Sequence, residues 1–552
     1  MNFNRDEMSE KKWFIFLQKY WLYIVVIIAV IIVALSSVKI YREEILEIDP
    51  AVKTEPQSTL SFASAYLDTL NPIVSKSEDT YYISKLIYNS LFDYTDSLNV
   101  EGDLAESYTV NTEKAYIDIT LKQGILWHNG DSFNSGDVSF TVNAIKSYGS
   151  GGLYYEKASR IRNVDIKDDS NLRIYFNNAD DCSLDSLVFP ILPKKEYKSA
   201  AALIKETDDF IPIGTGMYKY SSYDALKELK LDANESFFGT KAQNSINIKI
   251  LPEKSMASNM MEIDAVTCYT DIGSDRKSLV EDKNFVMYDM ISNDVDFIVF
   301  NTDNPLLASK KLRKGICYAI DEKSILSEGY MDDGILTDTI YYPGFLGVAD
   351  SKDTYAFNRE KASEVLAGEG YEDRDLNGKL EDKDGNEVSV NLLVNNNNAN
   401  RIAAARIMEK NLEQSGFDVS VKSVDWEEYN SLIEEKDFDI LLTGYEVEAS
   451  YDLRSFFDGT NPWAYENTEL LEKVNELDRL HTAEEYTSIY SEVKKTLVDE
   501  AQYYPLCYKK MGLIGVETFE AGKLPMFNNI YKNCSTWSWK KKITEEKNNK
   551  NS

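Results

Sequence analysis

Histidine is almost absent from this chain of 552 residues, and its scarcity excludes several kinds of active site. The sequence contains two histidines, His128 and His481. It also lacks the GxSxG, HExxH and P-loop patterns of serine hydrolases, zinc peptidases and nucleotide-binding enzymes. Because an imidazole needs an oriented partner to act as a base, we expect His128 to be a loop residue with structural hydrogen bonds, and His481 to be an exposed residue of a polar helix. The sequence predicts no catalytic residue and no metal centre built on several imidazoles.

Two further motifs are incomplete. Gly214-Thr215-Gly216 lacks the third glycine and the strand-to-helix setting of a dinucleotide site, so we expect these glycines to permit a tight turn. The chain has five cysteines, and none follows the CxxC spacing of zinc or redox sites. We expect buried thiols that pack as small hydrophobic groups, without a disulfide framework.

Basic residues are also in short supply. The chain has 60 lysines and arginines against 92 aspartates and glutamates, a formal net charge of -32. Such a surface repels nucleic acids and anionic lipid headgroups, so we expect no nucleic-acid partner. The acidic exterior is typical of a soluble extracellular protein, and attraction of cationic ligands into a cleft is the open alternative.

One long stretch carries no charge. Trp21 to Val38 is almost wholly apolar, and its 18 residues would span roughly 27 Å as a helix, close to the thickness of a bilayer. Because basic residues are concentrated before it, the sequence predicts a cytoplasmic segment at 1–19, a transmembrane helix at 20–38 and an extracellular stalk at 39–57. A signal peptide cleaved near Ala34-Leu35-Ser36 is the alternative. At the other end, the polar segment 541–552 is expected to be disordered.

Strand-like and helix-like patterns alternate through the rest of the chain. The segments 116–121, 172–176 and 388–394 have the pattern of strands, whereas 401–415 and 470–480 have the pattern of helices. This alternation predicts an α/β fold.

Several short motifs follow one another in a particular order. Leu104-Ala105-Glu106-Ser107-Tyr108 precedes Gly124-Ile125-Leu126-Trp127-His128-Asn129-Gly130-Asp131, and Asp137-Val138-Ser139-Phe140-Thr141 comes next. Leu70-Asn71-Pro72 lies upstream, and Ile213-Gly214-Thr215-Gly216-Met217-Tyr218-Lys219 lies downstream. The order resembles that of the family 5 extracellular solute-binding proteins, the peptide, dipeptide and nickel receptors of ABC importers. The likeness runs from about Leu60 to about Asn533.

The resemblance implies an architecture. We expect a two-lobed periplasmic-binding-protein-like fold of the large type, with an inserted subdomain at about 72–195. Lobe I would comprise 58–294 with 509–540, and lobe II would comprise 295–508. The two crossings between the lobes would form a hinge that closes over the ligand.

The resemblance also implies a function. We expect a monomeric, membrane-tethered receptor on a Gram-positive-type cell surface that delivers oligopeptides or a related polar solute to the permease and ATPase subunits of an ABC importer. One alternative is a receptor for a non-peptide solute, such as an oligosaccharide or a metal chelate. Another is a signalling or chaperone ectodomain that binds peptide segments of a partner.

Three segments are implied to bind the ligand. The first follows the Leu70-Asn71-Pro72 motif, and the second is a pair of tyrosines that would form aromatic walls or pack against the subdomain. The third is a loop at 443–454, where the family places an aspartate on the ligand's ammonium group but this chain has Ala449 nearby. Glu446, Glu448 or Asp452 would substitute for it. The candidates are Lys76, Ser77, Glu78, Tyr154, Tyr155, Gly444, Tyr445, Glu446, Glu448 and Asp452.

One element resembles a metal site. Asp373 to Asp384 has oxygen-bearing side chains at positions 1, 3, 5, 9 and 12 and glycine at position 6, the pattern of an EF-hand-type calcium loop. The candidate ligands are Asp373, Asp375, Asn377, Lys379, Glu381 and Asp384. A calcium ion here would be structural, and an acidic β-turn without metal is the alternative. No other cofactor is expected.

Overall fold

The computed structural model describes residues 59–207, 209–273, 276–348, 354–450, 452–477 and 483–540. The described residues belong to one compact unit. The cytoplasmic segment, transmembrane helix, stalk, His481 and tail 541–552 that the sequence predicts lie outside the described residues. Among the residues that are described, no helix has both the length and the apolar character needed to cross a membrane.

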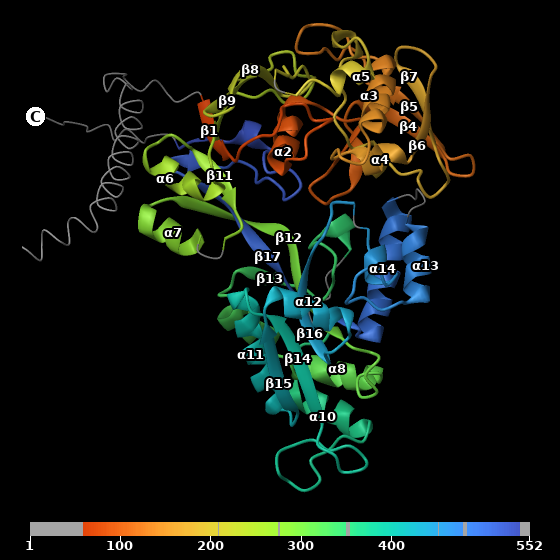
Figure 1. The fold of residues 1–552 in the computed structure, drawn as a ribbon, viewed down its shortest axis with the longest axis vertical. Helices are drawn as coiled ribbons and strands as arrows, with labels where there is room; N and C mark the ends of the chain where they lie inside the picture. The colour runs from red at the N-terminus through yellow and green to blue at the C-terminus, as the bar shows by residue number, and fades with distance from the viewer. Residues whose placement is uncertain are drawn as a thin grey trace, which may run out of the picture. The chain divides into compact units, whose positions relative to one another are not determined.

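One large mixed sheet organises the unit (Figure 1). Its strand order is β15-β14-β16-β12-β17-β11-β1-β10-β9-β8, and β13 pairs with β17 beside this path. The strands are β1 (Thr59–Ser64), β8 (Tyr218–Asp224), β9 (Glu228–Ala233), β10 (Ser245–Ile250), β11 (Cys268–Asp271), β12 (Val286–Phe300), β13 (Gly334–Leu336), β14 (Ser389–Asn395), β15 (Asp418–Val424), β16 (Ile440–Glu446) and β17 (Tyr503–Gly515). The expected lobe I contributes one end of this sheet and the expected lobe II contributes the other.

The long antiparallel strands β12 and β17 join the two ends of the sheet (Figure 1). Their ladder is irregular between Ile291 and Val295 and again between Asp296 and Phe297. The expected lobe boundary after Asp294 falls inside the first irregularity. Because an extra residue bends a strand locally, a change in sheet direction is favoured at this point. The division into lobes itself stays a prediction.

A second sheet lies within the expected subdomain. Its order is β4-β5-β7-β6, formed by β4 (Ala105–Asn111), β5 (Tyr116–Leu121), β7 (Asn171–Phe176) and β6 (Ile161–Ile166). The inward residues of β5, Ile117 and Ile119, are buried in the same core as Val138 and Ile145 of helix α3 (Ser135–Tyr148). The hairpin of β2 (Phe92–Tyr94) and β3 (Val100–Gly102) and the short helix α4 (Tyr155–Ser159) complete the region used below.

The expected lobe II has a core of its own. The strands β14, β15 and β16 pair in parallel, and residues from this sheet and from adjacent helices bury a common apolar cluster. The helices between 310 and 500 are α8 (Lys310–Ala319), α9 (Glu322–Ser324), α10 (Arg359–Gly368), α11 (Ala399–Glu413), α12 (Trp426–Glu434), α13 (Thr468–Glu476) and α14 (Ala483–Glu500). The other elements are α2 (Glu78–Ile87), α5 (Ala200–Leu203), α6 (Ala257–Glu262), α7 (Arg276–Lys283), β18 (Phe519–Glu520) and β19 (Ser538–Trp539).

The local predictions from sequence patterns are confirmed. The strand-like segments correspond to β5, β7 and β14, and the helical segments correspond to α11 and α13, with differences of a few residues at the ends. The α/β class is therefore correct. All five cysteines are buried and free, as expected from their spacing.

His128 has the structural role that the sequence predicts. Its backbone N–H donates to Gly214 O at 2.9 Å, while Gly214 N–H donates to its Nδ1 at 3.1 Å. Nε2 lies 3.1 Å from Gly216 O, so the neutral ring carries its proton on Nε2 and donates it there. Burial lowers the pKa of His128 to about 4, which keeps the ring neutral at physiological pH.

The expected tight turn does not explain why glycine is required at positions 214 and 216. Neither glycine has a positive φ. A Cβ on Gly214 would instead lie 1.8 Å from Ile87 O, and one on Gly216 would lie 2.5 Å from the same atom. Glycine is required because two backbone segments touch, and Gly216 N–H donates to Ile87 O at 2.8 Å.

Candidate functional site

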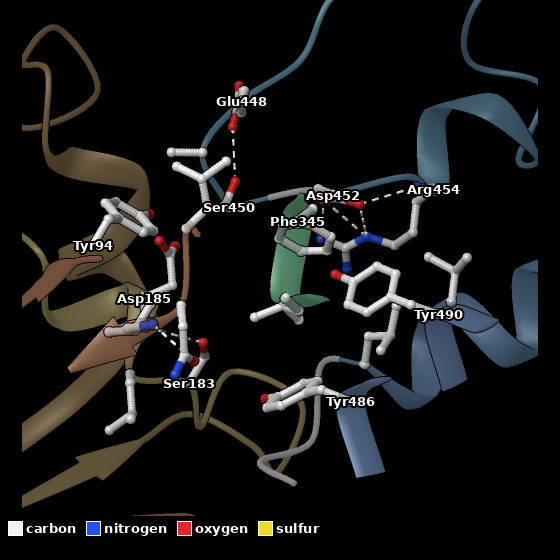
Figure 2. Close-up of a pocket in the computed structure, with 18 of the residues that line it drawn as sticks. Tyr94, Ser183, Asp185, Phe345, Glu448, Ser450, Asp452, Arg454, Tyr486 and Tyr490 are labelled. Atoms are coloured by element: carbon white, nitrogen blue, oxygen red, sulfur yellow. Dashed lines mark hydrogen bonds and ion pairs between the residues drawn. The ribbon is translucent and has the colours of Figure 1, made fainter. Parts of the chain in front are cut away.

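A cavity of about 270 Å³ lies between residues of the expected subdomain and residues of the expected lobe II. One side is lined by Tyr94, Leu98, Asn99, Val100, Tyr108, Arg160, Ser183, Leu184 and Asp185. The other side is lined by Phe345, Leu346, Glu448, Ala449, Ser450, Asp452, Arg454, Val474, Leu477, Tyr486 and Tyr490. Figure 2 shows Tyr94 and Asp185 facing Phe345, Asp452 and Tyr490 across the space.

Aromatic packing fixes one wall. Phe345 packs edge-to-face on Tyr490 with ring centroids 4.7 Å apart, and Tyr341 packs on the same ring at 5.1 Å. Tyr486 lies one helical turn before Tyr490 on α14, so both rings project from one face of the helix. This part of the wall thus presents packed aromatic rings to the cavity.

A half-buried ion pair supports the opposite wall. Lys157 Nζ lies 2.8 Å from both carboxylate oxygens of Asp185. Burial raises the pKa of Asp185 to about 7, and the negative charges of Glu448 and Asp452 act in the same direction. Burial also lowers the pKa of Lys157 to about 7, with help from the positive charges of Lys85 and Arg160. The contact between the two groups compensates both of them for the loss of water.

Asp452 is already paired. Arg454 Nε donates to both of its carboxylate oxygens at 2.8 and 3.0 Å, and Arg454 N–H donates to Oδ1 at 3.0 Å (Figure 2). Burial opposes ionisation of Asp452, but the hydrogen bonds from Arg454 outweigh it and lower the pKa of the carboxyl. Asp452 therefore offers a ligand's ammonium group less unpaired charge than its position in the sequence suggests.

The candidates of the loop at 443–454 are divided. Glu448 and Asp452 line the cavity, whereas Gly444, Tyr445 and Glu446 lie in β16 and do not. A Cβ on Gly444 would lie 1.9 Å from Arg401 Nη2, so glycine makes room for a neighbouring ion pair. Tyr445 packs on Phe456 at 4.9 Å. A ligand-binding role for these three residues stays a prediction.

The candidates of the first segment do not line the cavity. Lys76 is exposed, and Ser77 caps helix α2 by accepting a hydrogen bond from Thr80 N–H at 3.4 Å. Glu78 accepts a hydrogen bond from Tyr82 OH at 2.7 Å. Their contact with a ligand stays a prediction.

The two candidate tyrosines also lie away from the cavity lining. Tyr154 is 4% exposed, and its hydroxyl is 3.3 Å from Ser84 Oγ, so it packs inside the subdomain. Tyr155 begins helix α4 and is half-buried. Tyr154 has the packing role that the sequence analysis left open as the alternative.

Several lining residues escaped the sequence analysis. Arg160, Asp185 and Tyr94 belong to segments outside the motifs that carry the family resemblance, and they meet only through the tertiary fold. Tyr486 and Tyr490 have the i, i+4 spacing of one helix face, a pattern that also occurs in ordinary cores. No local pattern marked these residues as a set.

A second ionic cluster lies at the crossing of β12 and β17. Asp296 is fully buried and accepts hydrogen bonds from Arg401 Nη2 at 2.7 Å and from Tyr330 OH at 2.7 Å. Lys509 Nζ lies 3.2 Å from Asp296 and 2.7 Å from Asp294. Burial opposes the charge of Asp296, but Arg401 and Lys509 outweigh it and lower the pKa of the carboxyl. The cluster ties α11 to both crossing strands.

The acidic loop at 373–384 satisfies much of its own hydrogen bonding. Asp373 Oδ2 accepts from Gly378 N–H at 2.9 Å, and Asp375 Oδ1 accepts from Asn377 N–H at 3.0 Å. Lys379 donates to Glu387 at 2.6 Å. In the described parts of the chain, no three carboxylate, imidazole or thiol side chains converge in a way that could hold a metal ion. Calcium binding by this loop, with Glu381 and Asp384 as further ligands, stays a prediction.

Comparisons with known proteins agree with the fold. The oligopeptide-binding protein AppA of Bacillus subtilis is 26% identical over 498 residues, which cover 85% of this chain and 89% of that protein. The solved structure of AppA in complex with a nonapeptide has a TM-score of 0.55 at 22% identity, over 88% of this chain and all of the other. An ABC transporter substrate-binding protein from Sinorhizobium meliloti has a TM-score of 0.72 at 16% identity, over 86% of this chain and 98% of the other.

The family assignment rests on a broader match. The model of "bacterial extracellular solute-binding proteins, family 5 Middle" matches residues 99–462, which is more than half of the chain. This range includes the subdomain sheet, the β12 crossing strand and most of the cavity lining. The chain belongs to the family 5 bacterial extracellular solute-binding proteins.

Proposed function

We propose that this protein binds an oligopeptide or a related polar solute in the cavity and delivers it to the permease and ATPase subunits of an ABC importer. The observation that carries the proposal is the origin of the lining, since Asp185 belongs to the expected subdomain whereas Glu448 lies in the loop after β16 of the expected lobe II. A solute that contacts both groups would draw the two sides together. The similarity to AppA supports a peptide as the solute.

The proposal makes the protein a receptor and not an enzyme. Its family is one of solute-binding proteins. In addition, the one histidine that the structure describes is committed to backbone hydrogen bonds, which leaves it no role as a base. We expect the receptor to act as a monomer, because one chain supplies both walls of the cavity.

Tethering to the cell surface belongs to the same proposal. Membership of an extracellular family supports a binding unit outside the membrane. The apolar stretch 20–38 with its basic flank supports a single anchoring helix whose N-terminus is cytoplasmic. On a Gram-positive-type surface, such an anchor would keep the receptor close to its permease.

Native mass spectrometry of the full-length chain, purified in detergent without refolding, tests the proposal. We expect a bound population whose released ligand fragments into amino-acid residues. The Glu448→Lys variant should lose this ligand, whereas Glu446→Lys should retain it because Glu446 does not line the cavity. A sugar or a metal chelate as the released ligand would contradict the peptide proposal.

A further inference from the structure

A short segment at 331–333, called the strap below, is tied to the expected lobe I by three cations. Lys277 Nζ donates to Met331 O at 2.8 Å, and Lys510 Nζ donates to Asp332 O at 3.2 Å. The third residue of the strap is the partner of a buried arginine that begins α7. The three cations belong to the expected lobe I, whereas the strap belongs to the expected lobe II. The strap therefore crosses the expected division between the lobes.

The backbone of the strap is strained. Met331 has a φ of 53° and Asp332 has a φ of 56°, so two successive residues with a Cβ adopt the left-handed conformation. This conformation is unfavourable for residues other than glycine, and it persists where surrounding contacts impose it. The lysine hydrogen bonds to the two carbonyl oxygens are contacts of this kind.

The strap adjoins the irregular part of the β12–β17 ladder. Lys510 pairs with Ile291 at the point where the regular ladder stops. Directly after the strap, Gly334 pairs with Lys509, the next residue of β17. A bend of the sheet at this point would move α7 relative to the strap and change the lysine contacts. Neither the strap nor the two lysines that bind it line the cavity.

We propose that the strap is a latch that controls the opening of the cavity from outside it. In this structure the cavity walls face each other while the strap is held in its strained form (Figure 2). Opening at the crossing strands breaks the lysine contacts and lets the strap relax. The buried arginine pair stays intact, because separating it would leave an unpaired buried charge. The latch sets the fraction of closed chains, whichever solute the cavity takes.

The latch requires two changes to act in opposite directions. Lys277→Ala removes a contact that holds the strap, so it should favour the open form. Asp332→Gly keeps the carbonyl oxygen that Lys510 binds but removes the cost of the left-handed conformation, so it should favour the closed form. Asp332→Asn removes the same charge and retains a Cβ, so it should leave the balance as it is in the parent.

Double electron–electron resonance on the full-length chain in detergent measures this balance. Spin labels at Glu156→Cys on α4 and Glu469→Cys on α13 report the distance between the expected subdomain and the expected lobe II. Both positions are exposed, and the five native cysteines are buried. Without added solute, Lys277→Ala should raise the ratio of long to short distances by about threefold or more. Adding Asp332→Gly to this variant should lower the ratio again.

Lys283→Ala is the matched control. Lys283 lies on the same helix, but its ammonium group contacts Glu262 and Asn259 within the expected lobe I. Its removal should leave the distances unchanged. Unchanged distances in Lys277→Ala, an equal shift in Lys283→Ala, or a shift toward long distances on adding Asp332→Gly would each overturn the latch.

The measurement separates this inference from the proposed function. The spin-label distances report the latch in a chain without added solute, so the expected shifts support it even if no peptide binds. Unchanged distances in every variant would overturn the latch and leave the proposed peptide receptor untouched.

Discussion

The Arg276 guanidinium, which is fully buried, donates hydrogen bonds to both carboxylate oxygens of Asp333, one of them at 2.6 Å. Arg276 begins helix α7 in the expected lobe I, whereas Asp333 precedes β13 in the expected lobe II. A charge pair with almost no access to water therefore spans the expected division, beside the crossing strands.

Removing one partner of this pair should be costly. We expect Asp333→Ala to lower the free energy of unfolding by about 3 to 5 kcal/mol, because the buried guanidinium loses its counter-charge. Urea unfolding followed by fluorescence measures the change. The exposed pair Lys195–Asp131 is the control, and Lys195→Ala should change stability by about 1 kcal/mol or less. Similar losses in the two variants would contradict the assigned burial.

His128 should make stability depend on pH. Its folded pKa, about 4, lies below the ordinary value of 6.5, so the unfolded chain binds more protons between these values. Stability is full above about pH 6.5 and falls toward pH 4 by about 3 kcal/mol. His128→Gln should lack this component when urea midpoints of both proteins are compared across that range. Parallel pH profiles would show that His128 is not buried as described.

Glu448 and Glu446 make a matched pair for the binding site. Glu448 lines the cavity, whereas Glu446 is exposed at the end of β16 and does not. Glu448→Gln should weaken binding of the natural ligand by about tenfold or more, mainly through faster dissociation. Glu446→Gln should bind like the parent in surface plasmon resonance. If Glu446→Gln weakens binding and Glu448→Gln does not, the cationic group of the ligand lies at Glu446 instead.

We propose that calcium binds the loop at 373–384 and stabilises the fold without contacting the solute. Gly378 N–H already donates a hydrogen bond to Asp373, which keeps the loop compact. Because no three carboxylates converge in the described residues, binding of an ion would have to bring further side-chain oxygens of the loop together. Millimolar calcium should then raise the Tm of the wild type and leave that of Asp373→Ala unchanged. Ligand affinity should be the same in both. If calcium does not change the Tm of the wild type, the loop is an acidic turn that binds no metal ion.

The proposed anchor predicts a topology for the chain in the membrane. Intact cells that express the full chain should keep it in the membrane fraction, and external protease should release the binding unit by cleavage after residue 38. Sequencing of the mature N-terminus is the decisive control. A start near Ser36 would replace the anchor by a cleaved signal peptide.

The fold was more predictable than the site, and the reason is physical. Strands such as Tyr116–Leu121 show a period of two along the chain, and the ordered family motifs implied the periplasmic-binding-protein-like architecture. Gly444 illustrates the difficulty, because a glycine in a sequence looks alike whether it approaches a ligand or a neighbouring side chain such as Arg401. Arg160 comes within electrostatic range of Asp452 only once the chain has folded. The charged residues that face each other across the cavity could therefore be identified only from the folded structure.

Amide hydrogen exchange in the irregular part of the β12–β17 ladder can report bending of the sheet at this point. Between the pairs Ile291–Lys510 and Val295–Tyr508, β12 contains Ser292, Asn293 and Asp294, whereas β17 contains only Lys509. This unequal stretch falls outside the regular ladder with β17, so its amide hydrogens should exchange with deuterated water sooner than their neighbours in β12. If ligand binding bends the sheet here, the solute will change isotope uptake at these three positions, even though none of them lines the cavity.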